Sequence, residues 1–236
     1  NVVYYDPRYP TNWISLDEAA TCRTVLLDYG FVDMNADELR SFMQTSGPDT
    51  LVVMSQTVIP DTVADVNSPD ALVREYLKRG GTVIFMGESP FYYQGHANGT
   101  STVWGTEGMA TFLGTYLGTL GINDTVSITG DGAARGLSQT WSSLRPVDVG
   151  RSNLTRVYAT SSGGAAAWLK NFCLSDPDSG FIRLWDGKGD FASAQYLADL
   201  AAVAGVAESS LAGSLVVLVG VWLIRQVRRR RLTHNP

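Results

Sequence analysis

Cysteine and histidine are scarce in this chain of 236 residues, which contains two of each. Cys22 and Cys173 can form at most one disulfide, and the sequence leaves open whether they do or remain buried thiols. His96 has no second histidine nearby and no CxxC pair or carboxylate cluster at ligand spacing, so we predict no metal site and no cofactor. Charged residues make up 17% and hydrophobic residues 44%, a balance that excludes an intrinsically disordered chain.

Basic residues are unevenly distributed along the chain. Five of the 18 lie in the segment 225–231, and no acidic residue follows Glu208. Residues 1–208 therefore carry 13 basic groups against 23 acidic groups. Because binding to phosphate backbones depends on Lys and Arg, we predict that this acidic body binds no nucleic acid.

The segment between Glu208 and Arg225 contains 16 uncharged residues, most of them apolar. As a helix it would span about 24 Å, and snorkelling arginines can supply the rest of a hydrocarbon core of about 30 Å. We therefore predict a single-pass transmembrane helix at 208–227, with the lipid bilayer as a partner. The positive-inside rule places the basic tail 228–236 in the cytoplasm and the domain 1–207 on the extracytoplasmic or luminal side. A buried core helix and an interfacial helix are the alternatives.

Two weaker features fit an exported domain. The chain starts at Asn1 without a charged and apolar leader, as expected after removal of a signal peptide. Acceptor triplets for N-glycosylation begin at Asn98, Asn123 and Asn153, slightly more than chance supplies. We therefore expect a glycoprotein domain outside the cytoplasm.

The first half of the chain alternates short apolar runs with capped helical stretches. This pattern predicts an α/β fold with a doubly wound, mostly parallel, flavodoxin-like sheet, followed by the transmembrane helix. Capping boxes at Ser15/Glu18 and Asn35/Glu38 indicate two helix starts, and Ser68 indicates a third. The expected strands are 2–5, 31–34, 51–55, 82–86, 126–129, 156–160, 165–172 and 181–185. The expected helices are 15–29, 35–44, 68–79, 107–120 and 191–204.

In such a sheet a ligand lies outside the carboxyl ends of the strands. Asp6 and Arg8 follow the first expected strand, Gln56 follows the third, and the turn Gly87-Glu88-Ser89-Pro90 follows the strand 82–86. These side chains should meet at one edge of the sheet.

The element order and the sharp Gly-led turn over residues 1–205 resemble the class I glutamine amidotransferase-like fold, including its ThuA-like relatives. In the amidotransferases that turn carries a nucleophilic Cys, supported by a later His and Glu. Here Glu88 stands at about that position, and neither Cys22 nor Cys173 is near it. The resemblance therefore implies the architecture without glutaminase chemistry.

Other chemistry at this turn is an alternative. Glu88 could act as a general acid or base with Asp6, as carbohydrate-cleaving sites require, or the carboxylates could merely cap backbone amides. Ser89 lacks the second glycine of a G-x-S-x-G elbow, so we interpret it as the N-cap of a helix that starts at Pro90. The Gly-rich run 130–136 has Arg135 where a dinucleotide loop needs glycine, so we predict a turn.

The segment 91–104 contains Tyr92, Tyr93 and His96 beside several glycines, and Trp13 lies in the loop after the first strand. Aromatic faces beside amides and carboxylates suit sugar rings, a protein partner or simple core packing. We therefore expect a non-enzymatic accessory or structural subunit, or a binding module, in contact with other membrane-protein subunits. The alternatives are a membrane-anchored glycan-processing hydrolase and a carbohydrate-binding receptor. The expected ligand-binding residues are Asp6, Arg8, Gln56, Glu88, Tyr92, Tyr93 and His96.

Overall fold

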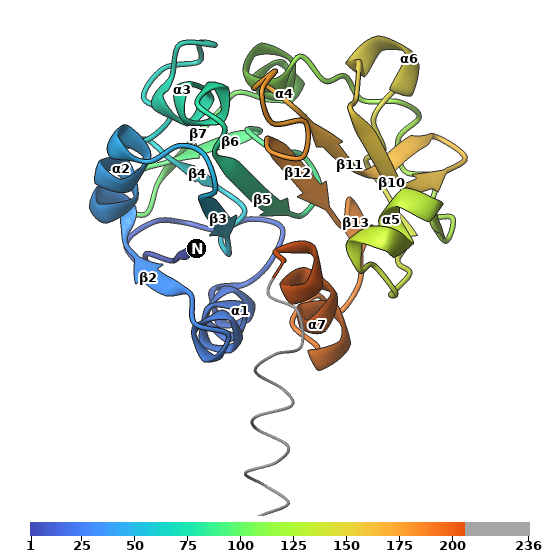
Figure 1. Cartoon of the computed structure of the whole chain (residues 1–236), viewed down its shortest axis with the longest axis horizontal. Helices are drawn as coiled ribbons and strands as arrows, with labels where there is room; N and C mark the ends of the chain where they lie inside the picture. Colours follow the sequence, from blue (N-terminus) through green and yellow to red (C-terminus); the bar gives the residue numbers. More distant parts are fainter. Residues whose placement is uncertain (206–236) are drawn as a thin grey trace, which may run out of the picture. The chain divides into compact units, whose positions relative to one another are not determined.

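The computed structural model describes residues 1–205, in which one large sheet is flanked by helices (Figure 1). Eight strands form this sheet in the order β2-β1-β3-β5-β12-β11-β10-β8. Their bounds are β1 (Val2–Tyr4), β2 (Val32–Met34), β3 (Leu51–Met54), β5 (Thr82–Met86), β8 (Ser127–Ile128), β10 (Arg156–Ser161), β11 (Gly164–Lys170) and β12 (Phe181–Leu184).

The large sheet has a parallel half and an antiparallel half. β1 pairs in parallel with β2 and β3, β3 pairs in parallel with β5, and β5 pairs in parallel with β12. β11 runs antiparallel to both β12 and β10, and β8 runs antiparallel to β10. The strand β12 therefore joins the two halves.

Helices cover both faces of this sheet. Their bounds are α1 (Leu16–Asp28), α2 (Ala36–Thr45), α3 (Leu72–Lys78), α4 (Thr106–Leu113), α5 (Gly130–Arg135), α6 (Val149–Ser152) and α7 (Ala194–Val203). Figure 1 shows α1 beside α7 on one side of the sheet, with α2, α3 and α4 on the other. Alternate strand residues such as Tyr4, Val52 and Phe85 belong to the core on the α2–α3–α4 side. The alternate positions of β1, β3 and β5, such as Val3, Val53 and Ile84, are also buried, as expected for strands covered on both faces.

Two small sheets flank the large one. In the first, β6 (Tyr93–Gly95) lies between β4 (Ile59–Pro60) and β7 (Ser101–Val103). β6 pairs in parallel with β4, and β6 and β7 form an antiparallel hairpin. In the second, β9 (Ser142–Ser143) pairs with β13 (Gly187–Lys188). The sequence predicted no strand within residues 91–104, where the β6–β7 hairpin lies.

Both predicted capping boxes are confirmed. Ser15 Oγ accepts a hydrogen bond from the Glu18 amide at 3.2 Å, and Glu18 Oε2 accepts one from the Ser15 amide at 2.7 Å. Asn35 and Glu38 form the same reciprocal pair at the start of α2. Each box satisfies two amides that a helix start would otherwise leave unpaired, which is why the pattern marks these starts so clearly.

Several predicted boundaries are wrong. The helix expected at 107–120 ends at Leu113, because Gly114 adopts a left-handed conformation with φ of 59°. α3 begins after Ala71, whereas Ser68 Oγ accepts from the Asp70 amide at 3.2 Å within a turn.

Two further local predictions are also wrong. The run 130–136 forms the short helix α5, capped by Thr129, rather than a turn. No helix starts at Pro90, since residues 89–92 form a turn in which the Tyr92 amide donates to the Ser89 carbonyl at 3.3 Å.

The predicted fold class needs correction. The described residues form a mixed α/β body with a large, mostly parallel sheet of eight strands. At one edge of this sheet β11, β10 and β8 are joined by antiparallel pairing. Within residues 1–205 no helix is long and apolar enough to cross a membrane. The longest, α1, has 13 residues and therefore a length of about 20 Å, well short of a hydrocarbon core of about 30 Å. The segments 208–227 and 228–236, predicted as a transmembrane helix and a cytoplasmic tail, lie outside the described residues.

Candidate functional site

The carboxyl ends of β1, β3, β5 and β12 lie along the same edge of the sheet, because these strands are parallel. Strand order reverses at β1, whose neighbours β2 and β3 lie on opposite sides of it. The crevice beside β1 and β3 is therefore the place where an open α/β sheet is expected to hold a ligand.

At this edge the loop after β1 is hydrogen-bonded to the residues after β3. Gln56 is fully buried, and its side chain accepts from the Asp6 amide at 2.6 Å and donates to the Tyr9 carbonyl at 3.0 Å. Thr57 Oγ1 accepts from the amides of Asn12 and Trp13 at 3.1 and 3.0 Å. The side chains after β3 thus hold the loop after β1, and Gln56 has a structural role.

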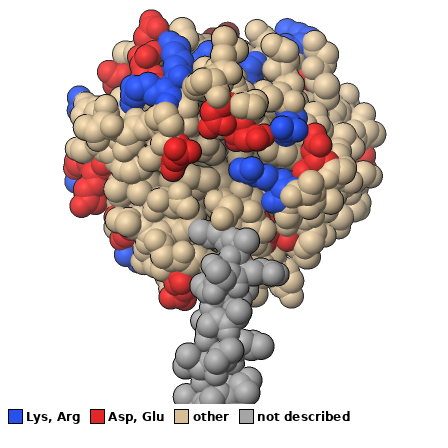
Figure 2. Space-filling view, in the orientation of Figure 1, with Lys and Arg blue, Asp and Glu red and all other residues tan. Residues whose placement is uncertain are grey.

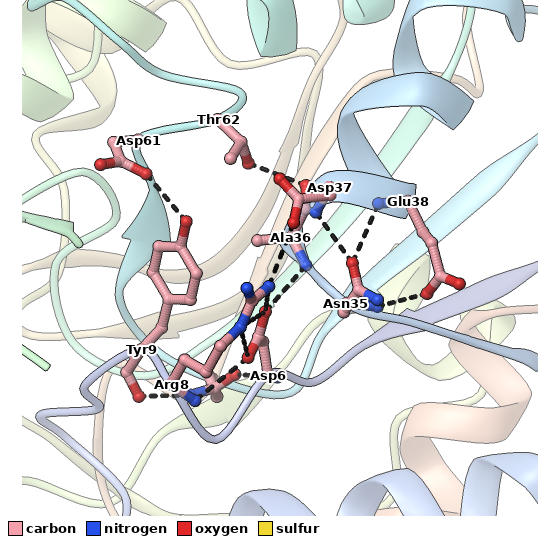
Figure 3. Close-up of polar contacts among 10 residues, drawn as sticks. Asp6, Arg8, Tyr9, Asn35, Ala36, Asp37, Glu38, Asp61 and Thr62 are labelled. Carbon is pink, nitrogen blue, oxygen red and sulfur yellow. Dashed lines mark hydrogen bonds and ion pairs between the residues drawn. The ribbon is translucent and has the colours of Figure 1, made fainter. Parts of the chain in front are cut away.

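Asp6 belongs to a polar network at the start of α2. Its carboxylate is 2% exposed and accepts from Arg8 Nη2 at 2.7 Å, from Arg8 Nε at 3.0 Å and from the Ala36 amide at 3.1 Å. Burial raises the pKa of Asp6, but the hydrogen bonds from Arg8 and Ala36 outweigh burial and hold it below its usual value. Figure 3 shows the Arg8 guanidinium between Asp6 and Asp37, to which it donates at 3.2 Å. Asp6 therefore caps backbone amides at a helix start, where a negative charge is stabilised.

Glu88 lies in a second, separate network. Its side chain is 17% exposed, and Oε2 lies 3.3 Å from Nε of the half-buried Arg145. Burial raises the pKa of Glu88 above its usual value, and the nearby Asp186 adds to this, whereas Arg145 lowers it. Asp6 Oδ1 accepts from Arg8 alone and Oδ2 accepts from Arg8 and Ala36, and neither Glu88 nor its partner Arg145 is among these contacts. Asp6 and Glu88 thus each have their own arginine and share no hydrogen-bond partner.

The side chain of Arg183 supports the turn that contains Glu88. The side chain is fully buried on β12, and Nη1 donates to the carbonyls of Glu88 and Arg145, each at 2.7 Å. Nη2 donates to the Ala165 and Ala166 carbonyls at 3.1 Å. Burial lowers the pKa of Arg183 to about 10. One buried guanidinium therefore ties the turn after β5 to β11 and to the segment around Arg145.

The counter-charge of Arg183 is equally buried. Asp186 Oδ2 lies 3.9 Å from Arg183 Nη2, and its carboxylate accepts from Trp141 Nε1 at 2.7 Å and from Ser143 Oγ at 2.6 Å. Neither residue was predicted from the sequence as part of the site. The available signal was an arginine inside the apolar run of β12, followed three positions later by an aspartate.

Three aromatic side chains gather beside the Glu88 turn. The ring centroids of Tyr92 and Tyr93 lie 4.8 Å apart. The ring centroid of Trp13 lies 6.0 Å from that of Tyr92 and 5.7 Å from that of Tyr93. Trp13 Cδ1 would lie 3.2 Å from a Cβ at Gly87, so the indole covers the turn directly. All three rings are partly exposed, and we call them the aromatic cluster. Trp104, in contrast, stacks on the buried Phe112 at 5.1 Å.

The remaining predicted site residues lie elsewhere. His96 follows β6 and contacts Asp61 rather than Glu88. Asn98, Asn123 and Asn153 are exposed, which leaves all three triplets accessible. In the described part of the chain no group of three or more histidine, cysteine or acidic side chains is placed to hold a metal ion.

The cysteines and the charges complete the description. Cys22 is a buried free thiol in α1 and Cys173 is a partly exposed free thiol after β11, both away from the Glu88 turn. Figure 2 shows acidic and basic side chains intermixed on the face drawn there, without a continuous basic surface.

Comparison with known proteins places this site in a family. The model of the MJECL34 family matches residues 1–206. The protein called Uncharacterized protein MJECL34, from Methanocaldococcus jannaschii, is 36% identical over 99 residues, which cover 38% of this chain and 33% of that relative. The match thus spans about a third of the relative's length. Since the family model covers the whole of the described α/β body, the chain belongs to the MJECL34 family.

Proposed function

We propose that the α/β body is a binding module of amidotransferase-like architecture without catalysis at the turn after β5, and that it serves as an accessory subunit of a larger assembly. The observation that carries this proposal is the state of the turn after β5. By the resemblance a nucleophile would stand at about the position of Glu88, but Glu88 is paired with Arg145, and both free cysteines lie in other elements. At the edge beside β1 the side chains of Gln56 and Thr57 bond to the chain's own loop, which supports a structural role for them.

The proposed ligand is a glycan that contacts the aromatic cluster. Partly exposed rings offer faces for the C–H groups of a sugar, and the adjacent Glu88–Arg145 pair offers an acceptor and donors for its hydroxyl groups. The glycan-processing alternative gains no support, because Asp6 is committed to Arg8 and Ala36. An extracytoplasmic location forms part of the proposal, and the exposure of the three acceptor asparagines supports it.

A glycan array probed with the full chain tests this function. Tyr92→Ala and Tyr93→Ala should each weaken binding about tenfold, the loss expected for a central aromatic contact worth somewhat more than 1 kcal/mol. Tyr29→Ala, at the end of α1, removes a partly buried tyrosine outside the cluster and should bind like the unmodified chain. Absence of any glycan binding, or equal loss in all three variants, would reject the glycan as ligand. Cleavage of a bound glycan that Glu88→Gln abolishes would instead establish the hydrolase.

A further inference from the structure

A chain of four hydrogen-bonded side chains lies apart from the Glu88 turn. Tyr9 Oη donates to Asp61 Oδ1 at 2.9 Å, a contact visible in Figure 3. Asp61 Oδ2 lies 2.8 Å from His96 Nδ1, and His96 Nε2 lies 2.9 Å from Thr102 Oγ1. The four residues come from the loop after β1, the end of β4 and the β6–β7 hairpin.

The position of each proton follows from the partners. An ionised carboxylate only accepts hydrogen bonds, so Nδ1 of His96 must carry a hydrogen to bond to Asp61. In the neutral imidazole Nε2 then has a free lone pair and accepts the hydroxyl hydrogen of Thr102. The hydroxyl of Thr102 is therefore bonded to a base whose orientation Asp61 fixes, and Tyr9 in turn fixes Asp61.

The backbone holds this arrangement firmly. In the hairpin Thr102 lies opposite Gln94, and the His96 amide donates to the Thr100 carbonyl at 2.9 Å. The Asp61 amide donates to the Gly95 carbonyl at 3.0 Å, which locks β4 to the hairpin. A Cβ at Gly95 would lie 2.8 Å from Val58, so the approach of the two segments is as close as glycine permits.

The chain of side chains is also accessible from solvent. The side chains of His96 and Asp61 are 30% and 35% exposed, and Thr102 lies on the exposed strand β7. A hydroxyl within hydrogen-bond reach of a base that a third group orients is the arrangement that activates a nucleophile for acyl transfer.

We infer that Thr102 is an acyl-accepting nucleophile, with His96 as its general base and Asp61 as a positioning residue, toward activated acyl esters. Thr102 Oγ1 attacks the acyl carbon while His96 Nε2 takes the hydroxyl proton. The bond between the acyl carbon and the leaving oxygen then breaks, and the proton passes from His96 to the departing alkoxide. The products are an acyl-threonine ester and a free alcohol, so no oxidant, reductant or metal ion takes part. This inference is independent of the proposed glycan site.

Treatment of the full chain with p-nitrophenyl acetate, followed by peptide mass mapping, tests the inference. Thr102 should become acetylated, whereas Thr100 should not, because its equally exposed hydroxyl bonds to the amide oxygen of Asn98. His96→Asn should slow acetylation of Thr102 about 100-fold, the lower end of what a general base contributes. Thr102→Val should abolish the modification on the hairpin.

The role of Asp61 has its own readout. Asp61→Asn should slow the acetylation of Thr102, and Asp61→Glu, which keeps a carboxylate, should restore part of the rate. Far-ultraviolet circular dichroism establishes that each variant is folded. If Thr102 is acetylated no faster than Thr100 in the unmodified chain, the inference is overturned, and this comparison needs no variant. An unchanged rate in folded His96→Asn overturns it as well.

Discussion

Replacement of Arg183 by methionine tests whether the buried guanidinium supports the Glu88 turn. Methionine has a similar length and fills the space but cannot donate hydrogen bonds. The variant leaves the carbonyls of Glu88, Arg145, Ala165 and Ala166 without this donor and Asp186 without its counter-charge. Removal of one partner from a buried ion pair costs about 3–5 kcal/mol. Because the free energy of unfolding of a domain is about 5–15 kcal/mol, Arg183→Met should be folded but much less stable than the unmodified chain.

Urea denaturation followed by tryptophan fluorescence measures this loss in the free energy of unfolding. The matched control is Arg156→Met, which removes an arginine whose ion pair with Asp178 is exposed to solvent. Exposed ion pairs contribute little, so the control should unfold at nearly the same urea concentration as the unmodified chain. If Arg183→Met is no less stable than Arg156→Met, the account of Arg183 as the support of the turn is refuted.

Three further predictions concern other parts of the fold. The pKa of Asp6 is lowered in the folded state, so the contribution of Asp6 to stability is present above about pH 4 and is lost as the pH falls through the folded pKa. The urea midpoint of Asp6→Asn should therefore fall less on acidification than that of the unmodified chain. Parallel plots of urea midpoint against pH for the two proteins would contradict this. A Cβ at Gly132 would lie 2.0 Å from the Tyr158 carbonyl oxygen, whereas one at Gly130 of the same helix meets nothing within 4 Å. Gly132→Ala should therefore lower the thermal midpoint and Gly130→Ala should not, and equal midpoints would refute the close contact. Burial raises the pKa of Cys22 to about 12, and a hydrogen bond with Ser175 lowers that of Cys173, so iodoacetamide at about pH 8 should alkylate Cys173 first in mass spectra. Equal alkylation rates under native conditions would show that Cys22 is not buried as described.

Features set by local contacts were predictable from the sequence. The capping boxes at Ser15 and Asn35 are confirmed because both partners of each box lie within four residues. The strands 82–86 and 181–185 were recognisable from apolar runs, since both are buried on two faces. The end of α4 was missed because Gly114 and Gly121 carry the same stop signal and both adopt a positive φ, and the helix ends at the first of them.

Features set by distant contacts were not predictable. The sequence predicted that Asp6 and Glu88 meet at one edge of the sheet but gave no sign that each would pair with its own arginine. Arg8 lies two residues from Asp6, yet Arg145 comes from a distant loop. The pairing of Asp61 with His96 depends on how the β6–β7 hairpin packs on β4, and these strands are too short to show a periodic pattern.

The position of β12 has a consequence for synthesis of the chain. β5 is buried along its whole length, and Val83 pairs with Phe181 of β12, a partner translated long after it. Until that partner leaves the ribosome, β5 presents an apolar edge with unpaired amides and carbonyls to other nascent chains. Cotranslational folding of the parallel half must therefore wait for the antiparallel half, and an interrupted translation product that ends before Phe181 would be prone to aggregate.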